Sequence, residues 1–236
     1  MRIHFVILLS LLMIAGIGGN NMFQQSNRVS GEHAGLENEI IKLPVPKYDG
    51  LTSIEKALSI RRSVRKYNTD PLTLAEVSQL LWAAQGITDR SKNFRTAPSA
   101  GALYPLELYV VIGRVREIKQ GVYKYKPHEH ELVKVRDGNM QEELSTAALR
   151  QNSVSESAIV LVFTAVFERT TKKYADRGIK YIHMEIGHAA QNVYLQAVSL
   201  NLGTVAIGAF RDEEVKKILN MPAEEHPLYI LPVGKL

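Results

Sequence analysis

The chain has 236 residues, a hydrophobic fraction of 45%, a charged fraction of 22% and a formal net charge of +5. These values are typical of one globular domain with a sizeable core, and a modest charge without basic tracts does not indicate a nucleic-acid-binding protein. There is no cysteine, which excludes disulfides, thiolate nucleophiles, zinc–thiolate sites, iron–sulfur clusters and a lipoprotein-type cysteine anchor.

The first twenty residues have the pattern of an export signal. Arg2 precedes an apolar run over residues 5–15, and Gly16, Gly18 and Gly19 follow. This order predicts a signal peptide or a short membrane anchor over residues 1–20. The run is shorter than the ~20 residues of a spanning helix, which favours a signal peptide. We therefore expect an exported or membrane-anchored protein, with a cytoplasmic location as the alternative.

Residues 21–50 are polar and contain Pro44 and Pro46, so we expect a flexible linker there and one folded domain over residues 51–236. The domain opens with a short amphipathic helix that Thr52 or Ser53 can cap. No internal repeat and no low-complexity block interrupts it.

A basic segment, Arg61–Tyr67, follows this first helix. If the segment is extended, Arg61, Ser63 and Arg65 share one face, because side chains alternate along an extended chain. Two guanidinium groups and a hydroxyl on one face suit a phosphate monoester. The alternative is a solvated basic turn that closes the helix.

The next elements are a helix and a loop. Thr73 and Glu76 form a capping-box pattern that opens a helix ending near Gly86. A loop over residues 98–105, Pro-Ser-Ala-Gly-Ala-Leu-Tyr-Pro, then leads into a predicted strand over residues 106–112. Ser99 in this loop is interpreted as a hydrogen-bonding loop residue rather than a nucleophile, because no G-x-S-x-G elbow is present.

The remaining elements alternate between strands and helices. Residues 121–125 and 131–135 predict a hairpin, and the apolar run 157–167 predicts a central strand covered on both faces. The pattern also predicts helices over 139–149, 179–201 and 212–219 and strands over 204–210 and 229–235, with Gly203 as the residue that ends the long helix. The resulting class is α+β, a mixed sheet surrounded by helices.

The long predicted helix contains His183, Glu185 and His188, which invite a metal-binding interpretation. We reject it, because these spacings do not place three side chains on one helix face and the motif is not H-E-x-x-H. No Rossmann glycine pattern and no P-loop is present either.

Together, the R-x-S-x-R segment and the P-S-A-G-x-x-Y-P loop before a strand resemble the nitroreductase family of flavin enzymes. The likeness is greatest to the branch that contains the azoline dehydrogenases of thiazole and oxazole peptide biosynthesis. It covers about Leu51 to the C-terminus. The family fold is α+β, with a mostly antiparallel central sheet surrounded by helices and a homodimer of the domain-swapped type.

The resemblance implies a set of FMN-binding residues. Arg61 and Ser63 are expected to hold the phosphate and ribityl end, Arg65 is expected near the pyrimidine edge of the ring, and Arg62 is expected to bind FMN without an assigned contact. The loop residues expected along the ring are Pro98, Ser99, Ala100, Gly101 and Leu103. Ile207 and Gly208 are expected to present backbone near N5, and Lys235 to contact the phosphate.

The resemblance further implies an FMN-dependent oxidoreductase that passes a hydride from NAD(P)H to a small oxidant, such as a nitroaromatic or a quinone, by a ping-pong mechanism. One alternative is an azoline-type dehydrogenase acting on a peptide heterocycle, whose Lys–Tyr pair would be Lys173–Tyr174 or Lys180–Tyr181. The other is a tethered flavin-binding protein without turnover. No catalytic side chain and no metal ligand is assigned.

Overall fold

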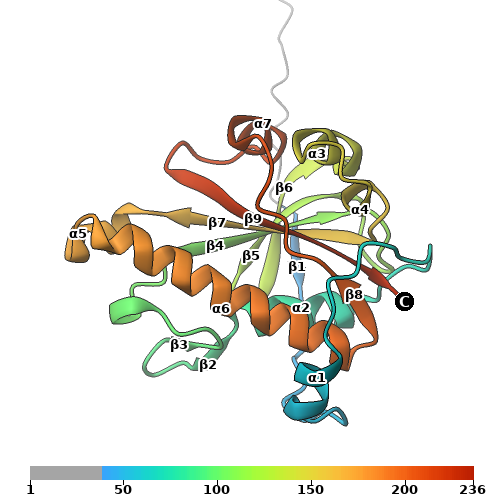
Figure 1. Ribbon diagram of the computed structural model, residues 1–236, viewed down its shortest axis with the longest axis horizontal. Coiled ribbons are helices and arrows are strands. Elements are labelled where there is room, and N and C mark those ends of the chain that lie inside the picture. The colour runs from blue at the N-terminus through green and yellow to red at the C-terminus, as the bar shows by residue number, and fades with distance from the viewer. Residues whose placement is uncertain (1–38) are drawn as a thin grey trace, which may run out of the picture. The chain divides into compact units, whose positions relative to one another are not determined.

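The computed structural model of the chain describes residues 39–236. Its centre is a seven-stranded sheet (Figure 1). The strands lie in the order β1 (Ile40–Lys42), β6 (Glu131–Asp137), β5 (Gly121–Lys126), β4 (Leu106–Ile112), β7 (Ile159–Val166), β9 (Glu225–Lys235) and β8 (Leu202–Thr204). All neighbouring pairs in this sheet are antiparallel. A separate ribbon joins β2 (Ile87–Asp89) to β3 (Phe94–Arg95).

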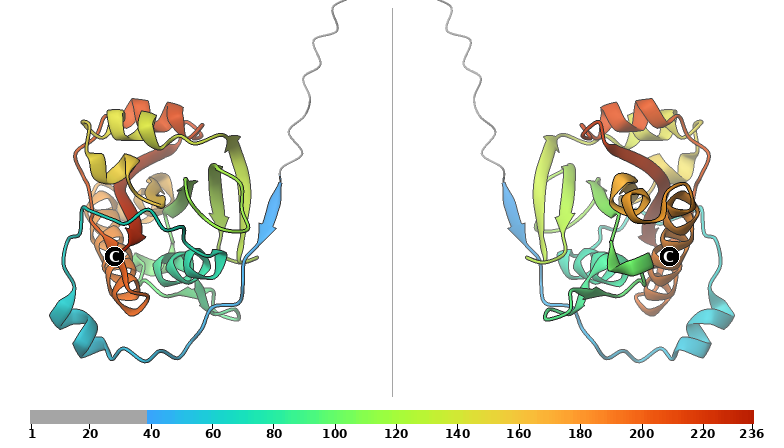
Figure 2. Two further views of the ribbon diagram at one scale, coloured as in Figure 1. Left: turned by 90° about the vertical axis from the view of Figure 1, so that its right-hand side faces the viewer. Right: turned by 90° about the vertical axis from the view of Figure 1, so that its left-hand side faces the viewer.

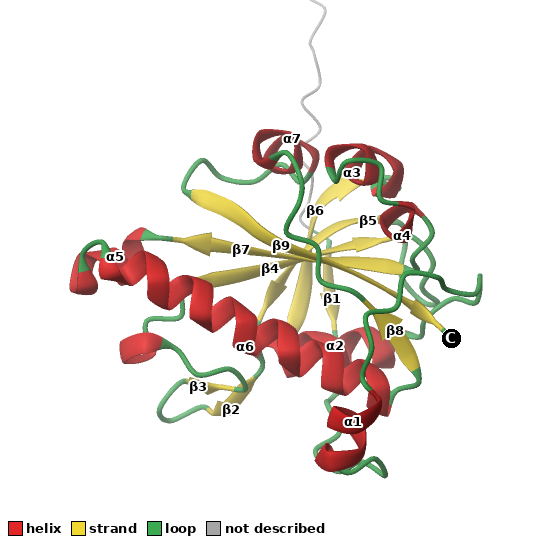
Figure 3. Ribbon diagram, in the orientation of Figure 1, coloured by secondary structure: helices red, strands yellow, loops and turns green. Residues whose placement is uncertain are grey.

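Helices lie on both faces of the sheet (Figure 3). They are α1 (Ile54–Ile60), α2 (Leu74–Gln85), α3 (Gln141–Ala147), α4 (Asn152–Ser155), α5 (Glu168–Tyr174), α6 (Arg177–Ser199) and α7 (Asp212–Ile218), with a short 3₁₀ turn, η1 (Ala100–Ala102). The α+β class with a mostly antiparallel sheet and surrounding helices is therefore confirmed.

Strand β4 shows how the sequence builds two cores. Leu108 and Val110 pack into the cluster that contains the buried faces of α2 and α6, whereas Tyr109 and Val111 pack into the cluster with α3, α4 and α7. Alternate residues of a strand point to opposite faces, so a strand covered on both sides is apolar throughout. The apolar run of β7 has the same cause.

Local signals predicted several boundaries correctly. Ser53 caps α1 and accepts a hydrogen bond from the Lys56 amide at 3.2 Å. Thr73 and Glu76 form the predicted capping box of α2. The long helix α6 and the β5–β6 hairpin also stand where periodicity placed them.

The structure differs from the expected elements in several places. Strand β1 lies inside the segment expected to be a flexible linker, where it pairs with β6. Regular strand β8 covers Leu202–Thr204 rather than 204–210, with only a single bridge at Ile207 beyond it. Asn201, with φ +55°, adopts the left-handed conformation after α6, whereas Gly203 lies within β8.

The expected signal peptide and membrane association need correction. In residues 39–236, no helix is both long and apolar enough to cross a membrane. Even α6, with 23 residues, carries charged side chains and buries one face against the sheet. The apolar run at residues 5–15, on which the expectation rested, lies outside the described residues.

Candidate functional site

The basic segment after α1 is extended and lies beside the end of the sheet. The Val64 amide donates to the Thr204 carbonyl at 2.9 Å, and the Asn68 amide donates to the Lys235 carbonyl at 3.0 Å. These backbone bonds attach the segment to β8 and to the end of β9. Of the side chains between them, Tyr67 donates to the carbonyls of Val64 and Pro232, whereas Arg65 and Lys66 are exposed.

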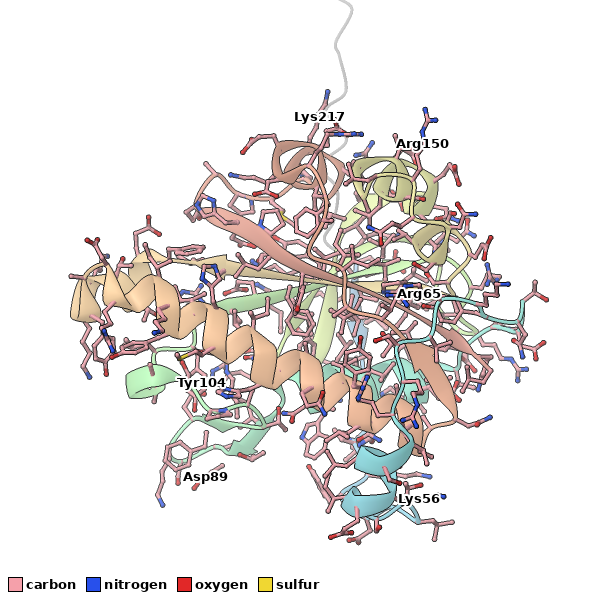
Figure 4. All side chains as sticks on the ribbon, in the orientation of Figure 1. Lys56, Arg65, Asp89, Tyr104, Arg150 and Lys217 are labelled. Carbon is pink, nitrogen blue, oxygen red and sulfur yellow. The ribbon has the colours of Figure 1, made fainter. Side chains whose placement is uncertain are left out.

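Two of the three residues predicted to share a face converge on Tyr194 of α6. The Arg61 guanidinium lies 5.0 Å from the centre of the Tyr194 ring, and the Ser63 and Tyr194 hydroxyls are 3.2 Å apart. Tyr194 also accepts a hydrogen bond from the Ala206 amide at 2.7 Å, which leaves its own proton for Ser63. Arg65 is exposed at the same edge (Figure 4).

Arg62 and Lys235 are placed differently. Arg62 is exposed and donates to the carbonyls of Ser59 and Arg61. Lys235 forms an ion pair with Glu76 in the capping box of α2. Burial alone would raise the pKa of Glu76, but Lys235 and the Thr73 amide together hold it below its ordinary value. Lys235 therefore already has a carboxylate partner.

The segment after β8 reaches the same region through Tyr194. Ile207 forms a two-way backbone bridge with Ile230, with bonds of 2.8 and 3.0 Å, and its side chain is buried. Gly208 is exposed. The Ala206–Tyr194–Ser63 contacts thus bring residues 206–208 next to the basic segment.

The 98–105 loop has an unusual backbone. Gly101, Ala102 and Tyr104 have φ values of +63°, +54° and +45°. A Cβ added at Gly101 would lie 2.7 Å from the Tyr174 hydroxyl and 3.1 Å from Lys173 Nζ. The left-handed backbone at residue 101 favours glycine, and the missing Cβ leaves room for the end of the Tyr174 side chain.

The loop and the basic segment contact α6 at different levels. The loop reaches α6 near Glu185, whose pKa the Ser99 hydroxyl lowers, whereas Ser63 contacts Tyr194, nine residues further along the helix. At 1.5 Å per residue this is about 14 Å. Figure 4 shows Tyr104 and Arg65 correspondingly far apart, with α6 passing between them. The single chain does not bring its two predicted binding segments together.

Comparison with known proteins decides the family. Residues 58–235 match the nitroreductase family model. The chain belongs to the nitroreductase family. Over 182 residues it is 51% identical to the nitroreductase-family protein MJ1384 of Methanocaldococcus jannaschii, covering 77% of this chain and 90% of that one. A solved nitroreductase structure from Ralstonia eutropha superposes with a TM-score of 0.74 at 26% identity, covering 85% of this chain and 91% of the other.

Two further relatives bear on the branch and on the chemistry. The microcin B17-processing protein McbC of Escherichia coli is 29% identical over 64% of this chain and 57% of its own length. The predicted likeness to the azoline-dehydrogenase branch is thereby confirmed. An FMN reductase [NAD(P)H] of Bacillus subtilis is 24% identical over 78% of this chain and 66% of its own length.

In this nitroreductase-family chain, several site residues have no signal in the sequence. Tyr194 links the basic segment to residue 206, and Arg95 lies 4.5 Å from the centre of the Tyr104 ring. Arg169 of α5 donates to the Tyr104 carbonyl at 3.1 Å. Each is an ordinary residue of a helix or strand, and only the folded arrangement identifies it.

The His-x-Glu-x-x-His sequence of α6 does not converge on one point. Glu185 is buried, whereas His183 and His188 are exposed. Burial raises the pKa of Glu185 to about 7, against smaller lowering effects of the Ser99 hydroxyl and of Arg95. Among residues 39–236 no group of three His, Asp or Glu side chains is placed to hold a metal ion.

Proposed function

We propose that this protein is an FMN-dependent oxidoreductase that transfers hydride from NAD(P)H to a small oxidant, such as a nitroaromatic or a quinone, by a ping-pong mechanism. The observation that carries the proposal is the convergence of Arg61, Ser63 and the 206–208 backbone on Tyr194, at the edge where the family's basic segment lies. Membership of the nitroreductase family and the likeness to an FMN reductase support an oxidoreductase.

The residues present suit a flavin mononucleotide. Arg61 and Ser63 offer charged and neutral donors to a phosphate, and Arg65 is an exposed cation next to them. The glycine at 101 carries no Cβ, so the backbone of the 98–105 loop can lie against Tyr174 and Lys173 of α5. Lys235 would first have to leave Glu76, so we expect it to contribute less to the phosphate than Arg61.

When bound, FMN supplies the hydride-accepting and hydride-donating centre. The chain's residues would bind and orient it. Arg61, Arg62 and Ser63 would hold the phosphate and ribityl end, and a cation such as Arg65 near the pyrimidine edge would stabilise negative charge on the reduced ring. Pro98, Ser99, Ala100, Gly101 and Leu103 would line one side, and Ile207 and Gly208 the N5 side.

The activity can be tested in two half-reactions. Purified protein loaded with FMN is mixed anaerobically with NADH or NADPH, and the flavin absorbance is followed until it bleaches. Addition of a quinone or a nitroaromatic then restores the absorbance. A protein that takes up no FMN contradicts the proposal, and one that binds FMN without bleaching is a flavin-binding protein without turnover.

We also propose that the active form is a homodimer of the domain-swapped type with two FMN sites at the subunit interface. The loop and the basic segment are separated on one chain, so a second copy can supply the missing half of each site. Helix α1 lies beside the C-terminal part of α6, joined to the rest of the chain by two extended segments (Figure 2), and a cavity of about 780 Å³ lies between the two helices. Ile54 and Leu58 of α1 are each 54% exposed, which indicates an uncovered surface.

Not all of the small residues of helix α6 are available to such an interface. Ala189 and Ala190 are buried in the chain's own core, whereas Gly187 and Met184 are exposed, and a Cβ at Gly187 would meet nothing within 4 Å. Met184→Arg is therefore expected to split the dimer and release FMN together, as measured by light scattering and flavin content on one sample. Glu142→Ala, at an exposed position of α3 on the other face of the sheet, is the control. A wild-type monomer that retains stoichiometric FMN would rule the interface out.

A second candidate is an azoline-type dehydrogenase. The observation that favours it is the placement of Lys173 Nζ and Tyr174 OH against Gly101 of the loop. Of the two Lys–Tyr pairs in the sequence, Lys173–Tyr174 is the one we propose. A peptide carrying a thiazoline ring would then bleach the FMN absorbance, and Lys173→Ala would abolish the bleaching while the neighbouring Lys172→Ala would not. Equal rates in the two variants would count against the pair.

A further inference from the structure

The 98–105 loop holds a backbone conformation that most residues avoid. Three of the four residues from Gly101 to Tyr104 lie in the left-handed region, and two of them, Ala102 and Tyr104, carry a Cβ. L-residues adopt this region at a cost in free energy, so other contacts must hold the loop in place. The Ala102 amide donates to the Ser99 carbonyl at 3.0 Å, and the Tyr104 amide donates to Ser99 Oγ at 2.9 Å. These two bonds close the loop on itself, and further contacts attach it to α5.

Arg169 of α5 joins the loop to the sheet. Its Nη1 atom donates to the Tyr104 carbonyl at 3.1 Å, and its Nη2 atom lies 2.6 Å from Oε1 of Glu107 near the start of β4. A planar guanidinium can hold two acceptors in a fixed relation, which the ammonium of a lysine on its flexible stem cannot do. Arg169 therefore fixes the Tyr104 carbonyl relative to both β4 and α5.

Glu107 is itself held by a network of ion pairs. Its Oε2 atom lies 3.1 Å from Lys124 Nζ of β5, and Lys124 also pairs with Glu225 of β9. Glu225 accepts hydrogen bonds from the Tyr109 hydroxyl at 2.9 Å and from the Thr164 hydroxyl at 3.2 Å. The side chains of Lys124, Glu107 and Glu225 are only 15%, 16% and 4% exposed. The carboxylate that the guanidinium contacts is thus already fixed, unlike a partner in an isolated surface ion pair.

The same helix meets the loop a second time. The last turn of α5 carries Lys173 and Tyr174. A Cβ added at Gly101 of the loop would lie 2.7 Å from the Tyr174 hydroxyl and 3.1 Å from Lys173 Nζ. Arg169 precedes Lys173 by four residues, so the two side chains lie on one face of the helix, about one turn apart. A loop that one short helix contacts at two points is expected to move together with that helix.

We propose that Arg169 is a positioning residue of the flavin site: it couples the 98–105 loop to the Lys173–Tyr174 end of α5, so that the two form one rigid wall beside the bound ring. The inference rests on the proposed function, because that function assigns the loop to the ring. Hydride transfer needs donor and acceptor in close, aligned contact, and a displacement of about 1 Å can cost about a hundredfold in rate. Arg169 acts on the reaction only through the loop and α5.

Arg169→Lys is the variant that separates the position of the loop from the charge of the network. Its ammonium can still pair with Glu107, but it cannot also hold the Tyr104 carbonyl in the geometry of the fork. We expect its melting temperature to stay close to that of the wild type. Amide hydrogen exchange in the full chain, followed by mass spectrometry, is expected to quicken roughly tenfold or more in residues 98–105 and 168–174 and to stay unchanged in β4 and β7.

The matched control is Arg150→Lys, the same substitution at an exposed position after α3. Figure 4 shows Arg150 far from Tyr104. Because its side chain lies on the other side of the molecule from the loop, exchange in residues 98–105 is expected to follow the wild type in this variant.

The consequence for the reaction is measured on the same proteins loaded with FMN and mixed anaerobically with NADH or NADPH. The rate of flavin bleaching at saturating nucleotide is expected to fall roughly tenfold or more in Arg169→Lys. The dissociation constant of FMN is expected to change little, since the basic segment would hold the phosphate. In Arg169→Ala, guanidinium added at a concentration too low to unfold the protein is expected to restore bleaching, whereas the same concentration of methylammonium is not.

The inference is overturned if exchange in residues 98–105 is the same in Arg169→Lys as in the wild type, or if it quickens while the bleaching rate does not change. A slower reaction that comes with a lower melting temperature and that guanidinium does not restore also overturns it, because Arg169 would then serve only the fold. These results leave the proposed FMN activity standing. If the wild type takes up no FMN or is not bleached, the proposed function falls and the flavin assignment with it, and the exchange measurement alone decides whether Arg169 couples the loop to α5.

Discussion

Two segments that contact the same helix are held in opposite ways. The 98–105 loop is fixed through side chains, because Ser99, Arg95 and Arg169 each bind a different group of Tyr104. The basic segment is fixed to β8 and β9 mainly through its backbone, and its Arg62, Arg65 and Lys66 side chains are exposed. Arg61 and Ser63 both contact Tyr194 of α6.

The difference fits what each segment would bind. A flat ring needs a wall of fixed shape, so strain in the loop is acceptable where buried contacts maintain it. A phosphate needs mobile, solvated cations that can close on it, and exposed guanidinium groups meet that need without strain. The comparison therefore predicts that changes at the loop act on folding stability, whereas changes at the basic segment act on ligand affinity.

The largest expected effect is on the free energy of unfolding, comes from Glu185 near the 98–105 loop, and depends on pH. The pKa of Glu185, about 7 in the folded chain against an ordinary 4.5, means that the folded state holds this proton more tightly than the unfolded state. Its stabilising contribution is full below pH 4.5 and is lost as the pH rises through 7. Glu185→Gln is therefore expected to be more stable than the wild type near pH 8, by up to about 3 kcal/mol.

Urea unfolding at about pH 5 and about pH 8 measures this difference. Glu168→Gln, an exposed carboxylate on α5, serves as the control and is expected to follow the wild type. Identical pH slopes for Glu185→Gln and the wild type would show that Glu185 is ionised in the folded protein.

The second-largest effect is expected on FMN affinity and comes from a change in the basic segment. Arg61→Ala removes a charge-assisted contact, so FMN binding is expected to weaken by about 1.5–3 kcal/mol, roughly ten- to a hundredfold. The free energy of unfolding is expected to change little, since backbone bonds hold the segment. Titration of FMN into the apoprotein measures the first quantity, with Lys235→Met expected to lose less. If affinity is unchanged in Arg61→Ala, the phosphate lies elsewhere.

Much of the fold was predictable because its signals are local. A capping box, a run of apolar residues and a helical period are all contained within about twenty residues, and α2, β7 and α6 were found on that basis. Strand β1 was not, because its three residues are stabilised only by β6, some ninety positions away. Short elements whose partners are distant leave no local pattern.

The candidate site also has some features that local sequence patterns predict and others that they do not. Alternation along an extended chain correctly placed Arg61 and Ser63 on one face, but it could not identify Tyr194, 131 residues later, as the side chain they share. Likewise, no pattern links Lys235 to Glu76. Those contacts depend on the register of α6 and on the path of β9 across the sheet, which only the packed structure determines.

A smaller effect tests the strain in the loop. Gly101→Ala places a Cβ at φ +63°, with an expected loss of about 1–2 kcal/mol in unfolding free energy, while the Tyr174 hydroxyl can shift to make room. Gly187→Ala on the exposed side of α6 is the matched control and is expected to gain up to ~1 kcal/mol from helix propensity. Thermal melting of both variants measures the contrast. Equal shifts in the two would mean that the loop is not strained at this position.

The smallest effect is expected from Tyr194, and it tests the link between the basic segment and residues 206–208. Tyr194→Phe keeps the ring under Arg61 but removes the hydroxyl that accepts from the Ala206 amide and contacts Ser63. We expect a loss of about 1 kcal/mol in stability and a severalfold loss in FMN affinity. Ser63→Ala removes only one of these two contacts, so its effect on stability is expected to be smaller than that of Tyr194→Phe. Should Ser63→Ala destabilise the protein as much as Tyr194→Phe, the Ala206 bond would contribute nothing, and the two segments would be held independently of each other.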